Sequence, residues 1–223
     1  MWGRALFRDR RGAGRALARS LEAYRERSDV IVLGLPRGGV PVAFEVADAL
    51  GAPLDVFVVR KLGLPEHPEL AMGAIASGGV RVLNHPVILE AGVTAEQVET
   101  VAREEQAELE RRLREYRGKH PPLDVRDLTV LLVDDGLATG STLRAAIAAL
   151  HELEPSWIAV AVPVGAKDTC LELRGEVDEL VCAHEPAQFV AVGSFYEDFA
   201  QTSDAEVHAL LERAAELRSR ALD

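Results

Sequence analysis

The chain has 223 residues, of which 48% are hydrophobic and 27% are charged, a composition typical of a globular domain. Such a composition excludes disorder over the whole chain. The net charge of −11 repels phosphate backbones, so we predict that the protein does not bind nucleic acid. A single phosphate group can still bind where backbone amides and one or two cations surround it.

The two cysteines, Cys170 and Cys182, form no CxxC motif, which favours a reduced protein with two ordinary buried thiols. The N-terminal residues contain no continuous apolar segment after their basic residues, so no secretory signal is predicted. No apolar stretch approaches the ~20 residues that a membrane helix needs. We therefore expect a cytoplasmic protein without a membrane partner.

Helical and β-branched segments alternate in the first quarter of the chain. The expected elements are a helix over residues 13–27, a strand over 30–35, a helix over 42–50 that ends at Gly51, and a strand over 54–59.

The middle of the chain differs in character. Residues 62–79 contain two prolines, four glycines and a histidine, which predicts a mobile loop leading into a short strand or hairpin. Residues 94–117 are charged and free of proline, which predicts a long helix that begins at Thr94 and ends near Gly118. We interpret this helix as an insertion whose inner apolar stripe could mediate dimerisation. Pro121 and Pro122 mark a connector.

The alternation resumes in the second half and then gives way to an irregular segment that holds much of the aromatic content. The expected elements are strands over residues 129–133, 157–162 and 180–183, helices over 141–153, 166–174 and 204–220, and the irregular segment 184–203.

Strands that alternate with helices predict an α/β fold with a mostly parallel, doubly wound, Rossmann-like sheet. Ligands bind such sheets beyond the carboxyl ends of the strands, so functional residues should follow the strands. We expect one domain over residues 1–223. Its expected parts are a core over about 13–90 and 125–183, a helical insertion over about 94–118, and a small hood lobe formed by 184–223 with residues 1–12.

The segment VLLVDDGLATGSTL at residues 130–143 carries the clearest chemistry. Two carboxylates, Asp134 and Asp135, follow a buried strand, and a loop rich in small and hydroxyl residues then leads into a helix. Carboxylates accept hydrogen bonds from vicinal sugar hydroxyls, and free amides at a helix N-terminus attract a phosphate. This order of groups predicts a binding site for ribose 5-phosphate.

The same segment resembles the phosphoribosyl-pyrophosphate signature of type I phosphoribosyltransferases, and the rest of the chain resembles the uncharacterised "predicted phosphoribosyltransferase" branch of that family. The resemblance implies a phosphoribosyltransferase fold. It implies that Asp134 and Asp135 contact the ribose hydroxyls. It also implies a 5-phosphate loop formed by Ala138, Thr139, Gly140, Ser141 and Thr142.

Two further segments support the resemblance. Pro36, Arg37, Gly38 and Gly39 follow the first predicted strand and resemble the family's pyrophosphate loop, in which Arg37 would face pyrophosphate. The segment VRKLGLP at residues 59–65 resembles a turn of adenine-type members and would place Lys61 near pyrophosphate as a point charge.

The implied reaction transfers phosphoribose from phosphoribosyl pyrophosphate to a nitrogenous base. Mg²⁺ bridging pyrophosphate and ribose oxygens would stabilise the leaving group, with Asp134 and Asp135 as indirect metal contacts. Arg37 and Lys61 would assist, and residues 62–79 would close as a lid. Glu66, His67 and Glu69 are candidates for moving a proton on the base.

The hood is expected to cover the base. Phe189, Phe195, Tyr196 or Phe199 could stack on a planar ring, with packing of the C-terminal helix as the rival explanation. Three residues near the N-terminus are candidate contributors to the same lobe: Phe7, Asp9 and Arg10.

Alternatives stay open at the level of activity. Ala138 occupies the loop position at which purine 6-oxo members usually carry an acid, so a hypoxanthine or guanine substrate is disfavoured. The main rival to the enzyme is a non-catalytic sensor that binds phosphoribosyl pyrophosphate or a nucleotide. An enzyme of another class, such as a nucleotide hydrolase, is a third reading. The resemblance also implies a homodimer.

Overall fold

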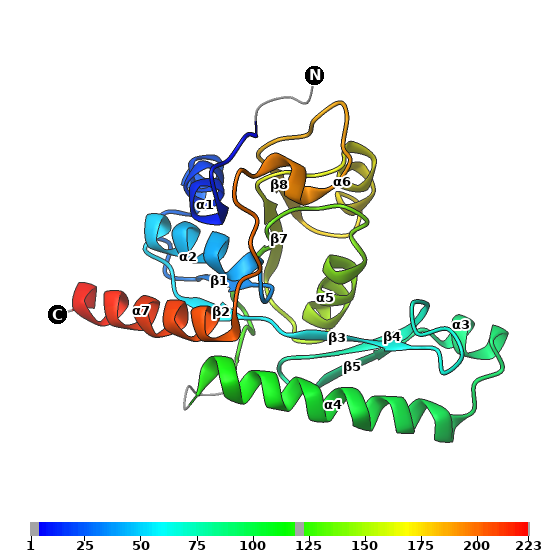
Figure 1. The fold of residues 1–223 in the computed structure, drawn as a ribbon. Helices are drawn as coiled ribbons and strands as arrows, with labels where there is room; N and C mark the ends of the chain where they lie inside the picture. Colours follow the sequence, from blue (N-terminus) through cyan, green and yellow to red (C-terminus); the bar gives the residue numbers. More distant parts are fainter. Residues whose placement is uncertain (1–4, 119–122, 223) are drawn as a thin grey trace.

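The computed structural model describes residues 5–118 and 123–222 (Figure 1). Pro121 and Pro122, which the sequence predicts as a connector, lie outside the described residues.

A five-stranded, fully parallel sheet forms the centre of the molecule, with the strand order β2-β1-β6-β7-β8. Because each connection between parallel strands needs a crossover, helices alternate with these strands along the chain. This sheet confirms the predicted doubly wound α/β fold. The five strands are β1 (Val30–Gly34), β2 (Leu54–Val56), β6 (Thr129–Val133), β7 (Trp157–Val162) and β8 (Glu179–Cys182).

Helices cover both faces of this sheet. On one face α1 (Arg10–Ala18), the 3₁₀ helix η1 (Arg19–Tyr24) and α2 (Gly39–Leu50) pack on alternate residues of β1, β6 and β7. On the other face α5 (Ser141–His151) and α6 (Lys167–Leu173) pack on the remaining residues. The central strands β1 and β6 are therefore buried on both faces, which explains why their sequences are continuously apolar.

The first helix differs from the prediction of one helix over 13–27. It begins at Arg10 because the Asp9 carboxylate caps it, accepting a hydrogen bond from Gly12 N at 2.7 Å. Beyond Ala18 the helix tightens to 3₁₀ geometry.

The predicted single strand over 54–59 is wrong, because the chain changes sheets within it. Phe57 N still donates to Gly34 O in β1, at 3.1 Å, whereas Val58 N donates to the Ser77 hydroxyl at 2.9 Å. From Val59 onward the chain belongs to a second, antiparallel sheet. Phe57 and Val58 are both fully buried, so no change in hydrophobic pattern reveals the switch.

The second sheet has the order β3-β4-β5 and forms an arm beside the main sheet (Figure 1). Its elements are β3 (Val59–Gly63), β4 (Ala71–Ala76), β5 (Val80–Leu83) and the short helix α3 (His85–Glu90). The loop expected after residue 62 corresponds to residues 64–70, and the strand or hairpin expected to follow it is present as β4 and β5.

Helix α4 (Ala95–Arg117) runs along this arm and begins with a capping box between Thr94 and Gln97. Its inner stripe packs on β3, β4 and the C-terminal helix α7 (Asp204–Leu222). Leu109 and Tyr116 on this stripe are each 1% exposed. Because its own chain covers the stripe, the structure does not support the suggested role of that stripe in dimerisation.

The segment 184–203 contains one short 3₁₀ helix, η2 (Val192–Phe195), and otherwise follows an irregular path across the carboxyl end of the main sheet. A backbone bridge joins Tyr196 to Phe7, so this segment contacts the N-terminal residues. Among the described helices, none combines the length and the apolarity needed to cross a membrane.

Candidate functional site

The carboxylate pair lies directly after β6, where the chain leaves the buried sheet. Asp134 is half-buried, and its Oδ1 accepts a hydrogen bond from Asp135 N at 2.8 Å. The Asp135 side chain is 16% exposed and pairs with Arg10, whose Nε lies 2.8 Å from Asp135 Oδ2. Each acid therefore has one fixed contact.

Both acids are held in surroundings that oppose ionisation. Burial raises the pKa of Asp134 well above its ordinary value, and the neighbouring charge of Asp135 raises it further. Burial also raises the pKa of Asp135, although Arg10 acts in the opposite direction. A ligand that donates hydrogen bonds or brings positive charge would compensate this cost.

The loop 136–142 presents backbone amides at the N-terminus of α5. Gly140 is the N-cap residue and has φ +73°, a left-handed conformation that favours glycine. The amides of Ala138, Thr139 and Gly140 donate to no acceptor among the described residues. They line a small pocket together with Asp134 and the hydroxyl residues Ser141 and Thr142.

Neighbouring elements hold this loop from behind. The Thr169 hydroxyl on α6 donates to Ala138 O at 2.7 Å, and Arg144 Nη1 on α5 donates to Thr139 O at 3.0 Å. Leu137 N donates to Val164 O at 2.9 Å. With its carbonyls engaged on the protein side, the loop is set to direct its free amides outward.

The second glycine-containing loop, residues 35–39, packs directly on the acids. A Cβ on Gly38 would lie 2.0 Å from Asp135 Oδ2, and a Cβ on Gly39 would lie 2.9 Å from Asp134 Cα. Only glycine permits this approach. The peptide bond between Pro36 and Arg37 is cis, and the amides of Arg37 and Gly38 have no acceptor among the described residues.

The two predicted cations lie in different surroundings. Arg37 Nη1 is 3.8 Å from Asp204 Oδ1 at the start of α7, and a third of its side chain is exposed. Lys61 is exposed on β3 and has no ion pair among the described residues. It shares a face of the sheet with Val59, which packs on the cluster containing α5, whereas Arg60 points the other way and pairs with Glu105 on α4. Lys61 therefore lies on the side of the arm that faces α5.

This arrangement of loops and acids occurs in a chain that matches a known protein family. Residues 9–199 match the model of the phosphoribosyl transferase domain. The chain belongs to this family.

Two Mycobacterium tuberculosis proteins, from strains H37Rv and CDC 1551, carry phosphoribosyl transferase as a provisional name. Each is 48% identical to this chain over 209 residues, which cover 94% of this chain and 47% of the relative. The chain thus spans about half the length of these relatives. A crystal structure of the protein TT1426 from Thermus thermophilus aligns with a TM-score of 0.83 and 40% identity, covering 93% of this chain and 98% of that one.

In this phosphoribosyl transferase domain the hood aromatics pack chiefly on one another. Tyr196 is 6% exposed, with ring centroids 5.4 Å from Phe7 and 4.9 Å from Phe199. Its hydroxyl donates to Asp135 O at 2.6 Å. Tyr196 thus supports the acid pair instead of presenting a free face. Phe189 and Phe195, half-buried and 5.5 Å apart, keep more exposed surface.

The candidate lid is narrower than residues 62–79, since β3 includes residues 62–63 and β4 covers residues 71–76. The remaining connection, 64–70, carries exposed Glu66, His67 and Glu69. Its described hydrogen bonds and its one ion pair, His67 with Glu69 at 3.8 Å, join only residues of the connection itself. No described contact of these three side chains reaches the acid pair.

Arg10 is the site residue for which the sequence offered least support. It pairs with Asp135, donates from Nη1 to Ala200 O at 2.6 Å and lies 3.9 Å from the centre of the Phe199 ring. It therefore joins α1, the acid pair and the hood. The sequence gives no signal for this contact beyond the expectation that Arg10 contributes to the hood lobe.

Proposed function

We propose that this chain transfers a phosphoribosyl group from phosphoribosyl pyrophosphate to a nitrogenous base, in the metabolism of purine or pyrimidine nucleotides. One observation carries the proposal: a loop of free amides at the N-terminus of α5 directly follows a half-buried carboxylate pair against which Gly38 and Gly39 pack. The family match and the relatives that carry the provisional transferase name support it.

In this proposal the ligand spans two loops. The 5-phosphate accepts hydrogen bonds from the amides of Ala138, Thr139 and Gly140 and from the Ser141 and Thr142 hydroxyls. The ribose hydroxyls donate to Asp134, which lines the same pocket, and to the adjacent Asp135. The pyrophosphate group lies over the loop 35–39 and accepts from the free amides of that loop.

The residues present fit a magnesium ion carried by the substrate. Two carboxylates with raised pKa values provide the hard oxygen groups that Mg²⁺ prefers, directly or through water. When bound, Mg²⁺ would neutralise charge that develops on the pyrophosphate leaving group.

The protein's own contribution is positioning and electrostatics. Arg37 can contact pyrophosphate once its guanidinium leaves Asp204. Because these two groups are 3.8 Å apart, their ion pair is weak, and breaking it costs little free energy. Lys61 adds a charge from the arm, and closure of residues 64–70 excludes water from the developing oxocarbenium ion. A planar base would bind on the exposed parts of Phe189 and Phe195 in the hood.

An assay of pyrophosphate release tests the proposal. The purified chain is mixed with phosphoribosyl pyrophosphate, Mg²⁺ and a panel of purine and pyrimidine bases. We expect release that depends on one class of base and falls at least ~100-fold in Asp134→Asn, while the exposed acid variant Asp48→Asn behaves like the wild type. Release of free base from a nucleotide without pyrophosphate would indicate a hydrolase instead.

A sensor is the second candidate. Ala138 leaves the phosphate loop without a titratable side chain, and Glu66, His67 and Glu69 have no described contact with the acid pair. Tight binding of phosphoribosyl pyrophosphate with no turnover of any base would favour this candidate.

A further inference from the structure

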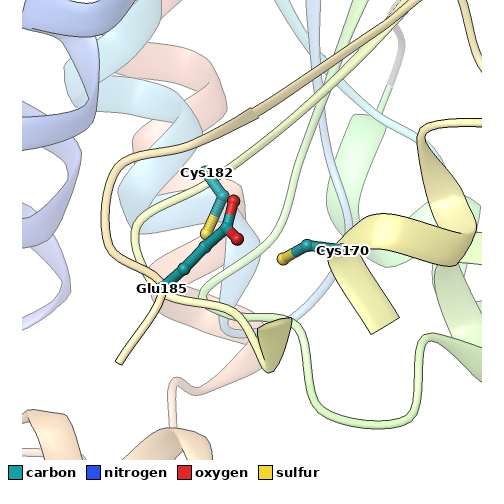
Figure 2. Close-up of side chains that lie close together, drawn as sticks. All are labelled: Cys170, Cys182 and Glu185. Atoms are coloured by element: carbon teal, nitrogen blue, oxygen red, sulfur yellow. The ribbon is translucent and has the colours of Figure 1, made fainter. Parts of the chain in front are cut away.

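The two cysteines come together behind the phosphate loop, although the sequence separates them. Cys170 lies on α6 and is fully buried, and Cys182 ends β8 and is half-buried. Glu185 follows on the segment leaving β8. The two Sγ atoms and a carboxylate oxygen of Glu185 all lie within 4.8 Å of one another (Figure 2). Both cysteines are free thiols, as expected, but the sequence did not predict that their sulfur atoms lie close together.

We propose that Cys170, Cys182 and Glu185 form a binding site for one thiophilic divalent cation, of which Zn²⁺ is the typical example. Zinc binds thiolate sulfur at ~2.3 Å and carboxylate oxygen at ~2.0–2.2 Å. Two atoms bound to one such ion are at most about 4.6 Å apart. Small side-chain rotations would thus place all three ligands on one ion, with a solvent molecule as the fourth.

The donor set selects the kind of metal. Two sulfur ligands favour zinc and other soft cations over Mg²⁺ and Ca²⁺, which prefer oxygen. The site is therefore distinct in chemistry from the acid pair at the end of β6.

The charges of the neighbourhood suit a divalent cation. Cys182 Sγ donates to His184 O at 3.1 Å. A bound metal ion would replace the protons of both thiols. Arg174 pairs with Oε1 of Glu185, which leaves the second carboxylate oxygen for the metal. Two thiolates, one carboxylate, one guanidinium and a divalent cation together are neutral.

Backbone geometry keeps the sulfur atoms in place. A Cβ on Gly165 would lie 2.5 Å from Cys170 Sγ and 3.1 Å from Cys182 Sγ. Only glycine at position 165 therefore lets both sulfur atoms pack against the backbone there. The same Gly165 forms a bridge with Leu137 of the phosphate loop, and its N–H donates to His184 O at 3.0 Å. A bound ion would link α6 to the end of β8 and the segment after it. Because Thr169, next to Cys170, donates a hydrogen bond to Ala138 O, this link would also stabilise the position of the phosphate loop.

Cobalt titration of the untagged, fully reduced chain tests the proposal without any activity assay. Tetrahedral Co²⁺ bound to thiolates gives a sulfur-to-metal charge-transfer band in the near ultraviolet, whereas Co²⁺ on carboxylates alone gives none. We expect this band at one equivalent, its displacement by Zn²⁺, its loss in Cys170→Ser and Cys182→Ser, and ~10–100-fold weaker binding in Glu185→Gln. Asp168→Asn, an exposed acid on the same helix, is the matched control and should match the wild type.

Protection from alkylation covers the case in which a cysteine variant fails to fold. In the wild type, Zn²⁺ should slow the reaction of Cys182 with iodoacetamide and raise the melting temperature. No charge-transfer band in the folded, reduced wild type would overturn the proposal, as would a band that persists in both cysteine variants. A Cys170–Cys182 disulfide formed on mild oxidation, with no metal bound by the reduced chain, would overturn it in favour of a redox pair.

Discussion

Among single residues, Asp134 illustrates a conflict between stability and binding. A carboxyl whose pKa is raised in the folded state lowers stability as pH rises through the interval between its unfolded and folded pKa values. Asp134→Asn removes this penalty and keeps the acceptor for Asp135 N. We expect the variant to gain on the order of 1 kcal/mol in free energy of unfolding at pH 8, and less near pH 4.

Urea unfolding at the two pH values measures this gain, with Asp48→Asn as the exposed control. A variant less stable than the wild type at pH 8 would contradict the assignment of Asp134 as a reluctantly ionised group.

Arg10 is expected to act in the opposite direction, as a residue whose loss destabilises the site. The Arg10 and Asp135 side chains are 12% and 16% exposed, so Arg10→Ala leaves a poorly solvated carboxylate without its partner. The expected cost is ~2–4 kcal/mol near neutral pH, and it should shrink in acid as Asp135 becomes protonated. Thermal unfolding measures it. Arg8→Ala, at an exposed neighbour, should change stability by no more than ~0.5 kcal/mol.

At the level of elements, the loop 35–39 owes its position to glycine. In Gly38→Ala the new methyl group would clash with the Asp135 carboxylate, so the loop or the acid must move. Since small misplacements are costly in such sites, we expect binding of phosphoribosyl pyrophosphate to weaken on the order of 100-fold. Gly175→Ala, whose Cβ would meet nothing closer than 3.5 Å, is the control. Equal affinities in both variants would show that this loop does not position the ligand.

The connection 64–70 offers a test of closure. Leu64 is anchored in the same core cluster as Val56, but the described hydrogen bonds of the connection are internal, so residues 65–70 can move without breaking a hydrogen bond to the main sheet. If it is a lid, amide hydrogen exchange over 64–70 should slow when phosphoribosyl pyrophosphate and Mg²⁺ bind, while α3 on the same arm keeps its rate. Unchanged exchange in a ligand-saturated sample would rule out closure by this segment.

Local features of the fold and the site could be predicted from the sequence, because neighbouring residues encode them. The acid pair, the loop 136–142 and the helix α5 are one continuous segment. The contact of Arg10 with Asp135 joins residues 125 positions apart, and no local pattern encodes it. The switch of sheets after Val56 escapes prediction because buried residues lie on both sides of it. The cysteine pair escapes prediction because α6 and β8 meet only in the folded chain.

For the molecule as a whole, the charge of −11 supports the prediction that nucleic acid is not a partner. Gel-shift assays with single- and double-stranded RNA and DNA at about 0.15 M salt should show no complex. A shifted band at micromolar protein would contradict this prediction and favour a regulatory role.

The expected homodimer and cytoplasmic location stay predictions. Sedimentation velocity would test the dimer, for which the stripe of α4 is not available as an interface.

Calorimetric titration with phosphoribosyl pyrophosphate in the presence and absence of Mg²⁺ tests the central claim most directly. The wild type should bind one equivalent per chain with Mg²⁺, and the double variant Asp134→Asn with Asp135→Asn should lose this binding while it remains folded. A folded wild type that binds no phosphoribosyl pyrophosphate would contradict the proposed site and leave only the fold in common with the family.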